Sequence, residues 1–242
     1  MDARERILVA IDTADTRAVA ALVERLAGTV GGIKLGLEFF NATGPEGVRA
    51  VIGDKLLFLD LKYHDIPNTV AGAVRSVVRA CQPAILNIHA SGGRAMMAAA
   101  VVANKETAEA IGITPPSLIA VTVLTSLDDD DLDTVGQQGP VTEQVVRLAA
   151  LAQEAGCDGV VCSPREITAI RASCGDDFHL VVPGIRPASS GTDDQKRTLT
   201  PGEAVAAGAD FLVIGRPITQ ASDPTAAAIA IADDIRAASA AA

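Results

Sequence analysis

The chain has 242 residues, of which 49% are hydrophobic, 21% are charged and only 2% are aromatic. The aliphatic content excludes an intrinsically disordered chain, and four cysteines in this length exclude a disulfide-held scaffold. The formal charge of −10 argues against binding to nucleic acid or to an anionic membrane. An anionic ligand would therefore need a local cluster of basic side chains.

The first residues, MDARER, carry two acids ahead of a short apolar run, which is unlike a secretory or transit signal. The longest apolar run, residues 95–103, is about half the length of a membrane span. The cysteines form no CxxC pair, so we interpret them as buried free thiols in a reducing compartment. These features predict a cytoplasmic protein without a membrane segment.

Short β-branched runs alternate with alanine-rich stretches of helical periodicity. The expected strands are residues 7–11, 32–35, 56–61, 84–89, 118–123, 159–162, 180–182 and 211–214. The expected helices include residues 16–26, 70–80, 93–105, 142–155 and 164–172. About eight such units in this length predict an α/β fold, the TIM (β/α)8 barrel, and no linker divides the chain. We therefore expect a single domain over residues 1–242.

Polar side chains gather where the expected strands end, and in a TIM barrel these ends carry the active site. In chain order they are Asp12, Lys34, Asp60, Lys62, His89, Ser91, Thr122, Thr125, Ser163, Arg186, Gly215 and Arg216. The opposite strand ends carry nothing comparable, so we expect a functional site at one mouth of the barrel.

The densest cluster is DLKYHDIPNT, residues 60–69. Side chains alternate along a strand, so Asp60 and Lys62 are expected to point to the same side, into the barrel. An isolated pair of this kind is more often a structural ion pair than a site. Lys34 and Asp65 change that interpretation, because two lysines and two aspartates in one cavity are costly unless they serve a function.

DLKYHDIPNT resembles the signature of the orotidine 5′-phosphate decarboxylase family. The similarity continues in order through LVAID (8–12), IKLGLEFF (33–40), NIHASGG (87–93), LIAVTVLTS (118–126), GVVCSPRE (159–166), VVPGIRP (181–187), DDQKR (193–197) and LVIGRPIT (212–219). A short DxKxxD alone is shared with a wider decarboxylase superfamily, whereas this ordered set is specific. The resemblance implies a TIM barrel that converts orotidine 5′-monophosphate to UMP and CO2 with no metal and no other cofactor.

The resemblance also implies catalytic roles for the matching residues. Lys62 would be the general acid that protonates C6 of the pyrimidine as CO2 leaves, with Asp60 beside the departing carboxylate. Lys34 would hold Asp60 and a ribose hydroxyl. Asp65 would complete a Lys–Asp–Lys–Asp array.

Substrate contacts and a partner are implied in the same way. The implied contacts are Asp12 to the ribose, Thr125 to the pyrimidine, and Arg186, Gln195, Gly215 and Arg216 to the phosphate. Asp65 and Thr69 would reach into the site of the second subunit of a homodimer. No nucleic acid or membrane is expected as a partner.

Elementary chemistry supports these roles. Decarboxylation leaves a carbanion in the ring plane with no adjacent carbonyl, and a fixed ammonium offsets that charge and then quenches it by proton transfer. Flanking carboxylates would keep Lys62 charged. The largest enzymatic accelerations need ~20 kcal/mol or more, which exceeds what one acid supplies, so binding energy from the phosphate must contribute.

A phosphate site is also indicated by position alone. TIM barrels often bind phosphate with the loops after strands seven and eight, which here are PGIR (183–186) and GRPI (215–218). Glycine lets backbone amides approach an anion, and arginine matches phosphate with paired donors. Residues 188–198 are rich in Ser, Gly and Asp, and we expect them to form a lid.

Two other functions remain open at this point. One is a magnesium-dependent sugar-phosphate decarboxylase of the same superfamily, which would need further carboxylates as metal ligands. The other is a non-catalytic homologue that binds a phosphometabolite, which would be favoured by loss of a member of the array. All four members are present.

Overall fold

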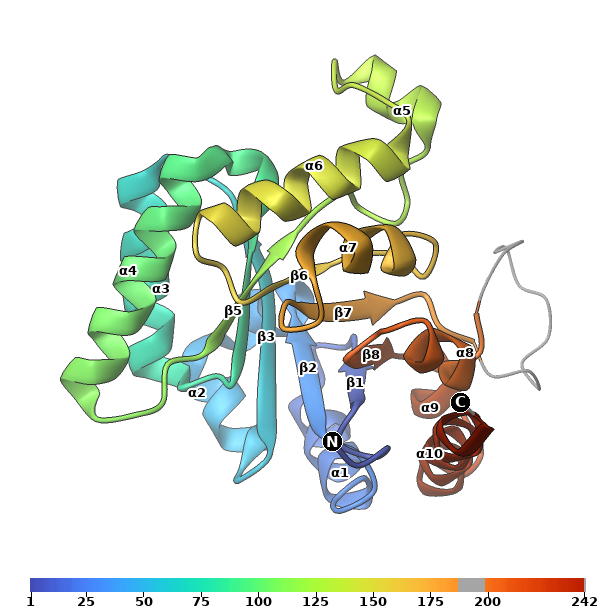
Figure 1. Cartoon of the computed structure of the whole chain (residues 1–242). Helices are drawn as coiled ribbons and strands as arrows, with labels where there is room; N and C mark the ends of the chain where they lie inside the picture. Colours follow the sequence, from blue (N-terminus) through green and yellow to red (C-terminus); the bar gives the residue numbers. More distant parts are fainter. Residues whose placement is uncertain (187–198, 242) are drawn as a thin grey trace. The chain divides into compact units, whose positions relative to one another are not determined.

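The computed structural model describes residues 1–186 and 199–241. Its eight strands are neighbours in chain order, and β8 returns to β1 to close a barrel (Figure 1). The strands are β1 (Ile7–Ile11), β2 (Gly32–Gly36), β3 (Leu56–Tyr63), β4 (Ile85–His89), β5 (Ser117–Val121), β6 (Gly159–Val161), β7 (His179–Pro183) and β8 (Phe211–Ile214). This confirms the predicted TIM barrel, and each observed strand end lies within two residues of its prediction.

Helices follow the strands along the chain. They are α1 (Thr16–Arg25), α2 (Leu37–Ile52), α3 (Pro67–Cys81), α4 (Gly93–Ile111), α5 (Asp129–Thr134), α6 (Val141–Glu154), α7 (Ile167–Cys174), α8 (Pro201–Ala206), α9 (Arg216–Thr219) and α10 (Pro224–Ala241), with a short 3₁₀ turn at Ala90–Gly92. Among the described residues, no helix is both long enough and apolar enough to cross a bilayer.

The helix expected at 164–172 begins later than predicted. The Glu166 carboxylate accepts the backbone N–H of Ser163 at 2.8 Å, and the N–H of Glu166 donates to the carbonyl of Ser163. This closed turn, with Glu166 buried, delays the start of α7 to Ile167. A local side-chain bond to the backbone thus competes with the helix.

Buried strands supply the core. Every residue of β1 and of β2 is buried, which is typical of parallel strands covered on both faces. The helices contribute apolar stripes, as Val70, Val74 and Val77 do on α3.

Contacts divide the chain into two compact units, residues 1–60 with 182–242 and residues 61–181. The divisions fall within β3 and within β7. Single-domain organisation over the whole chain stays a prediction.

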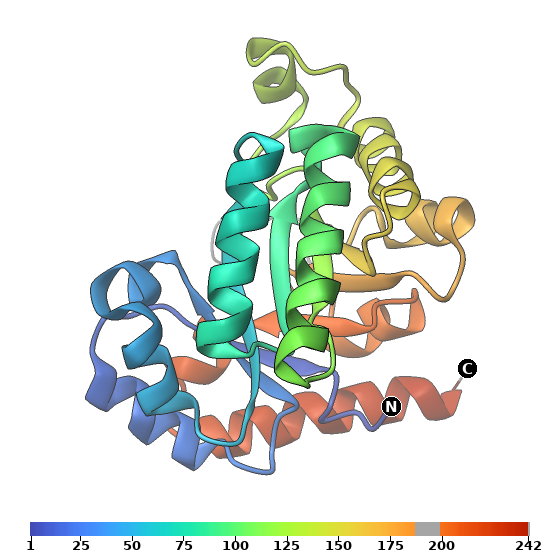
Figure 2. The same ribbon diagram turned by 90° about the vertical axis from the view of Figure 1, so that its left-hand side faces the viewer.

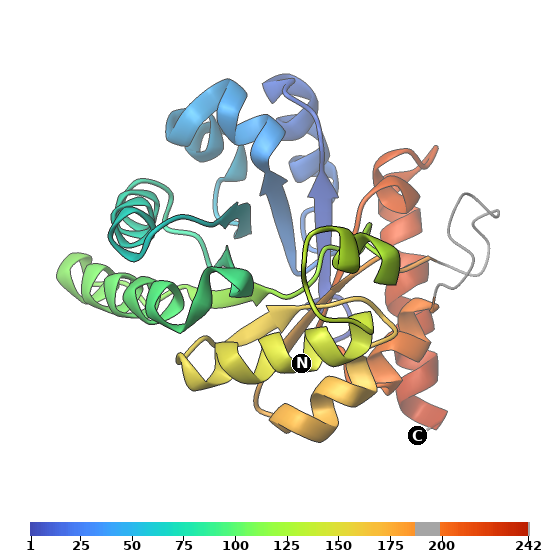
Figure 3. The same cartoon turned by 90° about the horizontal axis from the view of Figure 1, so that it is seen from above.

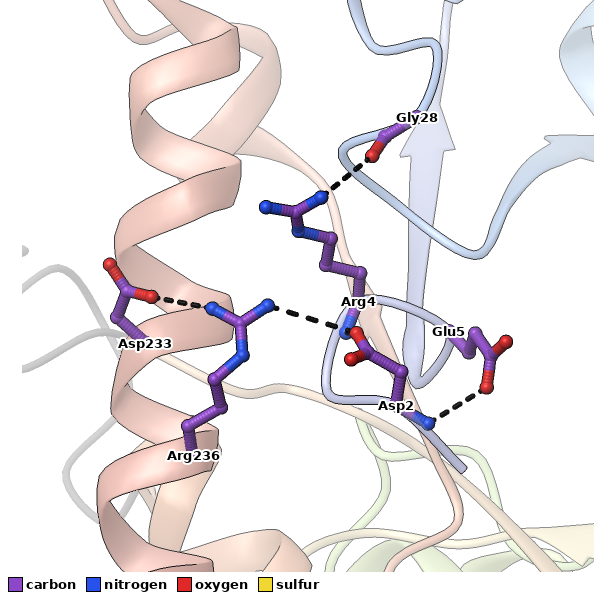
Figure 4. A network of polar contacts seen from close by, with 6 residues as sticks. All are labelled: Asp2, Arg4, Glu5, Gly28, Asp233 and Arg236. Carbon is purple, nitrogen blue, oxygen red and sulfur yellow. Dashed lines mark hydrogen bonds and ion pairs between the residues drawn. The ribbon is translucent and has the colours of Figure 1, made fainter.

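In the first unit, α10 packs against α8 and α9, and the N-terminal segment lies beside it. The Arg236 guanidinium bonds Asp233 on its own helix at 2.6 Å and lies 3.7 Å from Asp2 (Figure 4). Arg4 donates to the carbonyl of Gly28 in the same network. Exposed pairs of this kind contribute about 1 kcal/mol at most, so the network orients the chain start more than it stabilises the fold.

In the second unit, α3 and α4 lie side by side as the principal helix pair (Figure 2). α6 and α7 form a second neighbouring pair (Figure 3). Pro67 occupies the first turn of α3, where a missing N–H costs nothing, and so sets the start of that helix directly after the loop at 64–66.

Candidate active site

Lys34 lies between two carboxylates in the first unit. Its Nζ is 3.2 Å from Asp60 Oδ2 and 3.4 Å from Asp12 Oδ1. Lys34 and Asp60 are each only 8% exposed, whereas Asp12 is exposed. The strand ends of β1, β2 and β3 thus place a cation between a buried anion and an accessible one.

Strand register explains this arrangement. Lys34 on β2 is opposite Ala10 on β1, so Asp12 follows two residues beyond that pairing. Gly36 is opposite Asp60 on β3. Parallel pairing therefore brings these side chains to the same end of neighbouring strands.

Gly36 leaves one side of the Lys34 ammonium without a side chain. A Cβ added at Gly36 would lie 3.4 Å from Lys34 Nζ and 3.9 Å from Asp12 Oδ1. We did not select this glycine from the sequence. Its position two residues after Lys34, within the IKLG run, was the available signal.

The two arginines expected to bind phosphate follow β7 and β8 in the same unit. Ile214 on β8 is opposite Val9 on β1, so Gly215 and Arg216 leave the barrel beside the strand that leads to Asp12. The Arg216 side chain is exposed, and that of Arg186 is half-buried. Both positions suit a guanidinium that meets a ligand.

Arg186 also marks the start of the expected lid. Its backbone N–H donates to the carbonyl of Leu199 at 3.3 Å, which joins the chain on either side of residues 187–198. The predicted lid at 188–198, and Gln195 with it, lies outside the described residues.

Lys62 lies at the start of the second unit and has an unusual backbone conformation. Its φ is 51°, in the left-handed region, although β3 extends to Tyr63. For a residue with a Cβ this conformation costs roughly 1–2 kcal/mol, and such strain is concentrated at functional sites. We expected the side chains to alternate between the two faces of the strand from Asp60 to Lys62. That alternation requires an extended backbone, so it does not apply at Lys62.

Asn87 on β4 accepts the backbone N–H of Lys62 through its side-chain Oδ1, at 2.8 Å. Asn87 is only 1% exposed. We did not select it from sequence, because a polar residue inside an apolar strand gives no indication of a partner 25 positions earlier.

The remaining predicted residues lie on the surface of the second unit. Asp65 is exposed in the loop after β3, where its Oδ1 accepts the N–H of Ile66 at 2.6 Å. Thr69 is exposed in the first turn of α3. Thr125 is exposed beyond the end of β5. These three are available to a ligand or to another chain.

Tyr63 provides a spectroscopic probe next to Lys62, because it is the single tyrosine of a chain without tryptophan. Burial raises the pKa of Tyr63 to about 12, and negative charge on Cys81 acts in the same direction. Both causes disfavour the phenolate.

We expect phenolate absorbance to appear with a midpoint near pH 12 in the folded protein, after a rapid pH jump, against about 10 in urea. Between these values the unfolded chain loses a proton that the folded chain retains, so this group makes the free energy of unfolding fall as pH rises. Tyr63→Phe should remove the signal and this part of the pH dependence. A folded midpoint near the unfolded one would contradict the burial.

The fold and the charged residues together define the class of protein. The fold is a parallel α/β barrel, a lysine lies between two carboxylates, and two arginines follow the last two strands. It is a TIM-barrel enzyme whose charged groups stand at the carboxyl ends of the strands. The comparison with family models makes this specific. The chain belongs to the orotidine 5′-phosphate decarboxylase / HUMPS family, whose model matches residues 5–231.

Individual relatives agree with this assignment. The chain is 60% identical over 231 residues to the orotidine 5′-phosphate decarboxylase of Rhodospirillum rubrum, covering 95% of this chain and 93% of the relative. It is 60% identical over 223 residues to the enzyme of the same name from Paramagnetospirillum magneticum, covering 92% and 94%. The crystal structure of the Lactobacillus acidophilus orotidine 5′-phosphate decarboxylase superposes with a TM-score of 0.84 at 36% identity, covering 95% and 98%.

Proposed function

We propose that this protein decarboxylates orotidine 5′-monophosphate to UMP and CO2, in pyrimidine nucleotide synthesis, without a cofactor. This is the activity named for relatives that match it over more than nine-tenths of their length. The observation that carries the proposal is the buried contact of 3.2 Å between Lys34 and Asp60 at the ends of β2 and β3. Lys62 follows Asp60 by two residues on the same strand.

Lys62 is the proton donor in this mechanism. The bond between C6 and the carboxylate breaks, CO2 leaves, and the electron pair stays on C6. The Lys62 ammonium stabilises that charge and transfers a proton from Nζ to C6, which gives UMP. The strained backbone at Lys62 supports the assignment, because strain of this kind is retained where function requires a fixed geometry.

Lys34 and Asp60 form the part of the site where the substrate carboxylate binds. Lys34 holds the Asp60 carboxylate in a fixed position with little exposure to water. A substrate carboxylate beside Asp60 is repelled, and the repulsion disappears when neutral CO2 forms. Asp12, accessible on the other side of Lys34, binds ribose hydroxyls.

Binding energy comes from the phosphate. Arg186 and Arg216 follow the two strands whose loops bind phosphate in many TIM barrels, and Gly215 allows close approach of the backbone. A guanidinium offers two parallel donors to phosphate oxygens. Gln195 is assigned to the same phosphate from the family resemblance, and Thr125 to the pyrimidine.

The active form is a homodimer in this proposal, and Asp65 and Thr69 serve the site of the second subunit. Both residues are exposed, and Ile66 between them is 67% exposed, so this end of α3 presents an apolar side chain to a partner. Cytoplasmic localisation also stays a prediction. The four cysteines are free and buried, which is consistent with a reducing compartment.

Mixing two inactive variants tests the shared site. Lys62→Ala and Asp65→Asn homodimers should each be nearly inactive, and mixed subunits should regain about a quarter of wild-type activity, since half of the dimers are mixed and each has one intact site. The measurement is decarboxylase activity after co-refolding in equal amounts. No recovery would show that Asp65 acts within its own subunit.

An ultraviolet assay of the purified protein with orotidine 5′-monophosphate and EDTA tests the activity itself. Loss of the orotate chromophore with release of CO2 is the expected result. Activity that disappears with EDTA would favour the magnesium-dependent sugar-phosphate decarboxylase. Binding of UMP without turnover would favour a non-catalytic phosphometabolite-binding homologue.

A further inference from the structure

Asn87 is a buried polar residue at the centre of β4. Its neighbours in the strand, Leu86 and Ile88, are fully buried and apolar, and Asn87 itself is 1% exposed. A buried amide must find hydrogen-bond partners or destabilise the fold. One such partner is the backbone N–H of Lys62, which donates to Asn87 Oδ1 at 2.8 Å.

This contact falls where the regular strand geometry of β3 is interrupted. In an extended strand the backbone N–H donates to a carbonyl of a neighbouring strand. At Lys62 the φ of 51° departs from extended geometry, and the N–H of the same residue donates to a side-chain oxygen. The bond therefore satisfies the backbone donor and fixes the peptide group that precedes the left-handed Cα of Lys62.

We propose that Asn87 is a positioning residue for the reaction, which acts by holding the backbone of Lys62 so that its ammonium is aimed at C6. The inference rests on the proposed function. The direction of the Cα–Cβ bond depends on φ, and a small rotation there is amplified along four methylene groups before it reaches Nζ. Proton transfer requires close, aligned atoms, whereas substrate affinity depends mainly on other groups.

Asn87→Leu tests this role, because leucine has a similar volume and no acceptor. We expect kcat for orotidine 5′-monophosphate to fall about 10²-fold, the effect of displacing a reacting group by about an ångström. KM, and the Kd of UMP measured by calorimetry, should change less than about threefold, since the loss falls on the transition state alone. If the Asn87→Leu variant does not fold, the Asn87→Ala variant, which also lacks the acceptor, is used for the same measurements.

Two variants separate positioning from a general loss of stability. Asn104 is also buried, at 3% exposure. Its side-chain amide donates to the carbonyl of Pro116 at 2.7 Å, directly before the first residue of β5. Asn104→Leu should lower Tm comparably and leave kcat unchanged. Asn87→Asp keeps an oxygen acceptor, and its kcat should return to within about tenfold of the wild type.

The outcomes are distinct. Unchanged kcat in folded Asn87→Leu, or equal kcat losses in Asn87→Leu and Asn104→Leu, would overturn the positioning role while wild-type activity upholds the proposed function. A rise in KM and in the Kd of UMP at constant kcat would also overturn it. A wild-type protein that does not decarboxylate the substrate would overturn both together.

Discussion

Replacing Lys62 with alanine is expected to lower kcat by more than about 10⁴-fold, or roughly 5 kcal/mol of transition-state stabilisation. The substitution removes two effects at once, because the same ammonium offsets the carbanion charge and delivers the proton. General acid catalysis alone contributes about 10²–10⁴-fold, and a preorganised charge adds to it. Steady-state assays at high enzyme concentration measure the residual rate.

The protein should remain folded in this variant, because Lys62 is only half-buried and its replacement by alanine leaves no large cavity. Circular dichroism, Tm and UMP binding verify this. Lys105→Ala is the matched control, since Lys105 is an exposed lysine on α4 outside the proposed site. Near-normal kcat in Lys62→Ala would eliminate the mechanism, whatever the control shows.

Replacing Arg216 with alanine should lower kcat/KM for orotidine 5′-monophosphate about 10²-fold, equivalent to about 3 kcal/mol from charge-assisted hydrogen bonds to phosphate. The loss should fall below about threefold for orotidine, which lacks the phosphate. Parallel assays of the nucleotide and the nucleoside measure the difference. This comparison isolates the phosphate because both substrates carry the same reacting group.

Arg236→Ala is the appropriate control for Arg216→Ala. Arg236 is also an exposed arginine of the first unit, and its partners are Asp2 and Asp233 in place of any ligand (Figure 4). It should change neither substrate's kcat/KM. Equal losses on nucleotide and nucleoside in Arg216→Ala would show that this guanidinium does not bind the phosphate.

Local patterns were sufficient to predict the barrel and most of its elements. Continuous apolar runs such as Ile7–Ile11 are buried wherever they pair, so their strand identity follows from their own side chains. Boundaries were less predictable where a side chain competes with the backbone. Glu166, whose carboxylate bonds Ser163, delays α7 by a turn for this reason.

Candidate site residues could be selected because parallel strands present their carboxyl ends together, so Lys34, Asp60 and Arg216 were identified by position alone. Their partners could not be identified in this way. The distance of Lys34 Nζ to Asp12 and to Asp60 depends on the pairing register of three strands. Gly36 mattered only once that register placed it over the ammonium.

The amino-acid sequence by itself thus determined the order of strands and helices, the barrel class and the set of charged residues at the strand ends. These properties depend on periodicity and composition within short segments. The tertiary structure alone decided the left-handed backbone at Lys62 and its bond to Asn87. A strained φ is retained only when distant groups stabilise it, and no local propensity encodes such a partner.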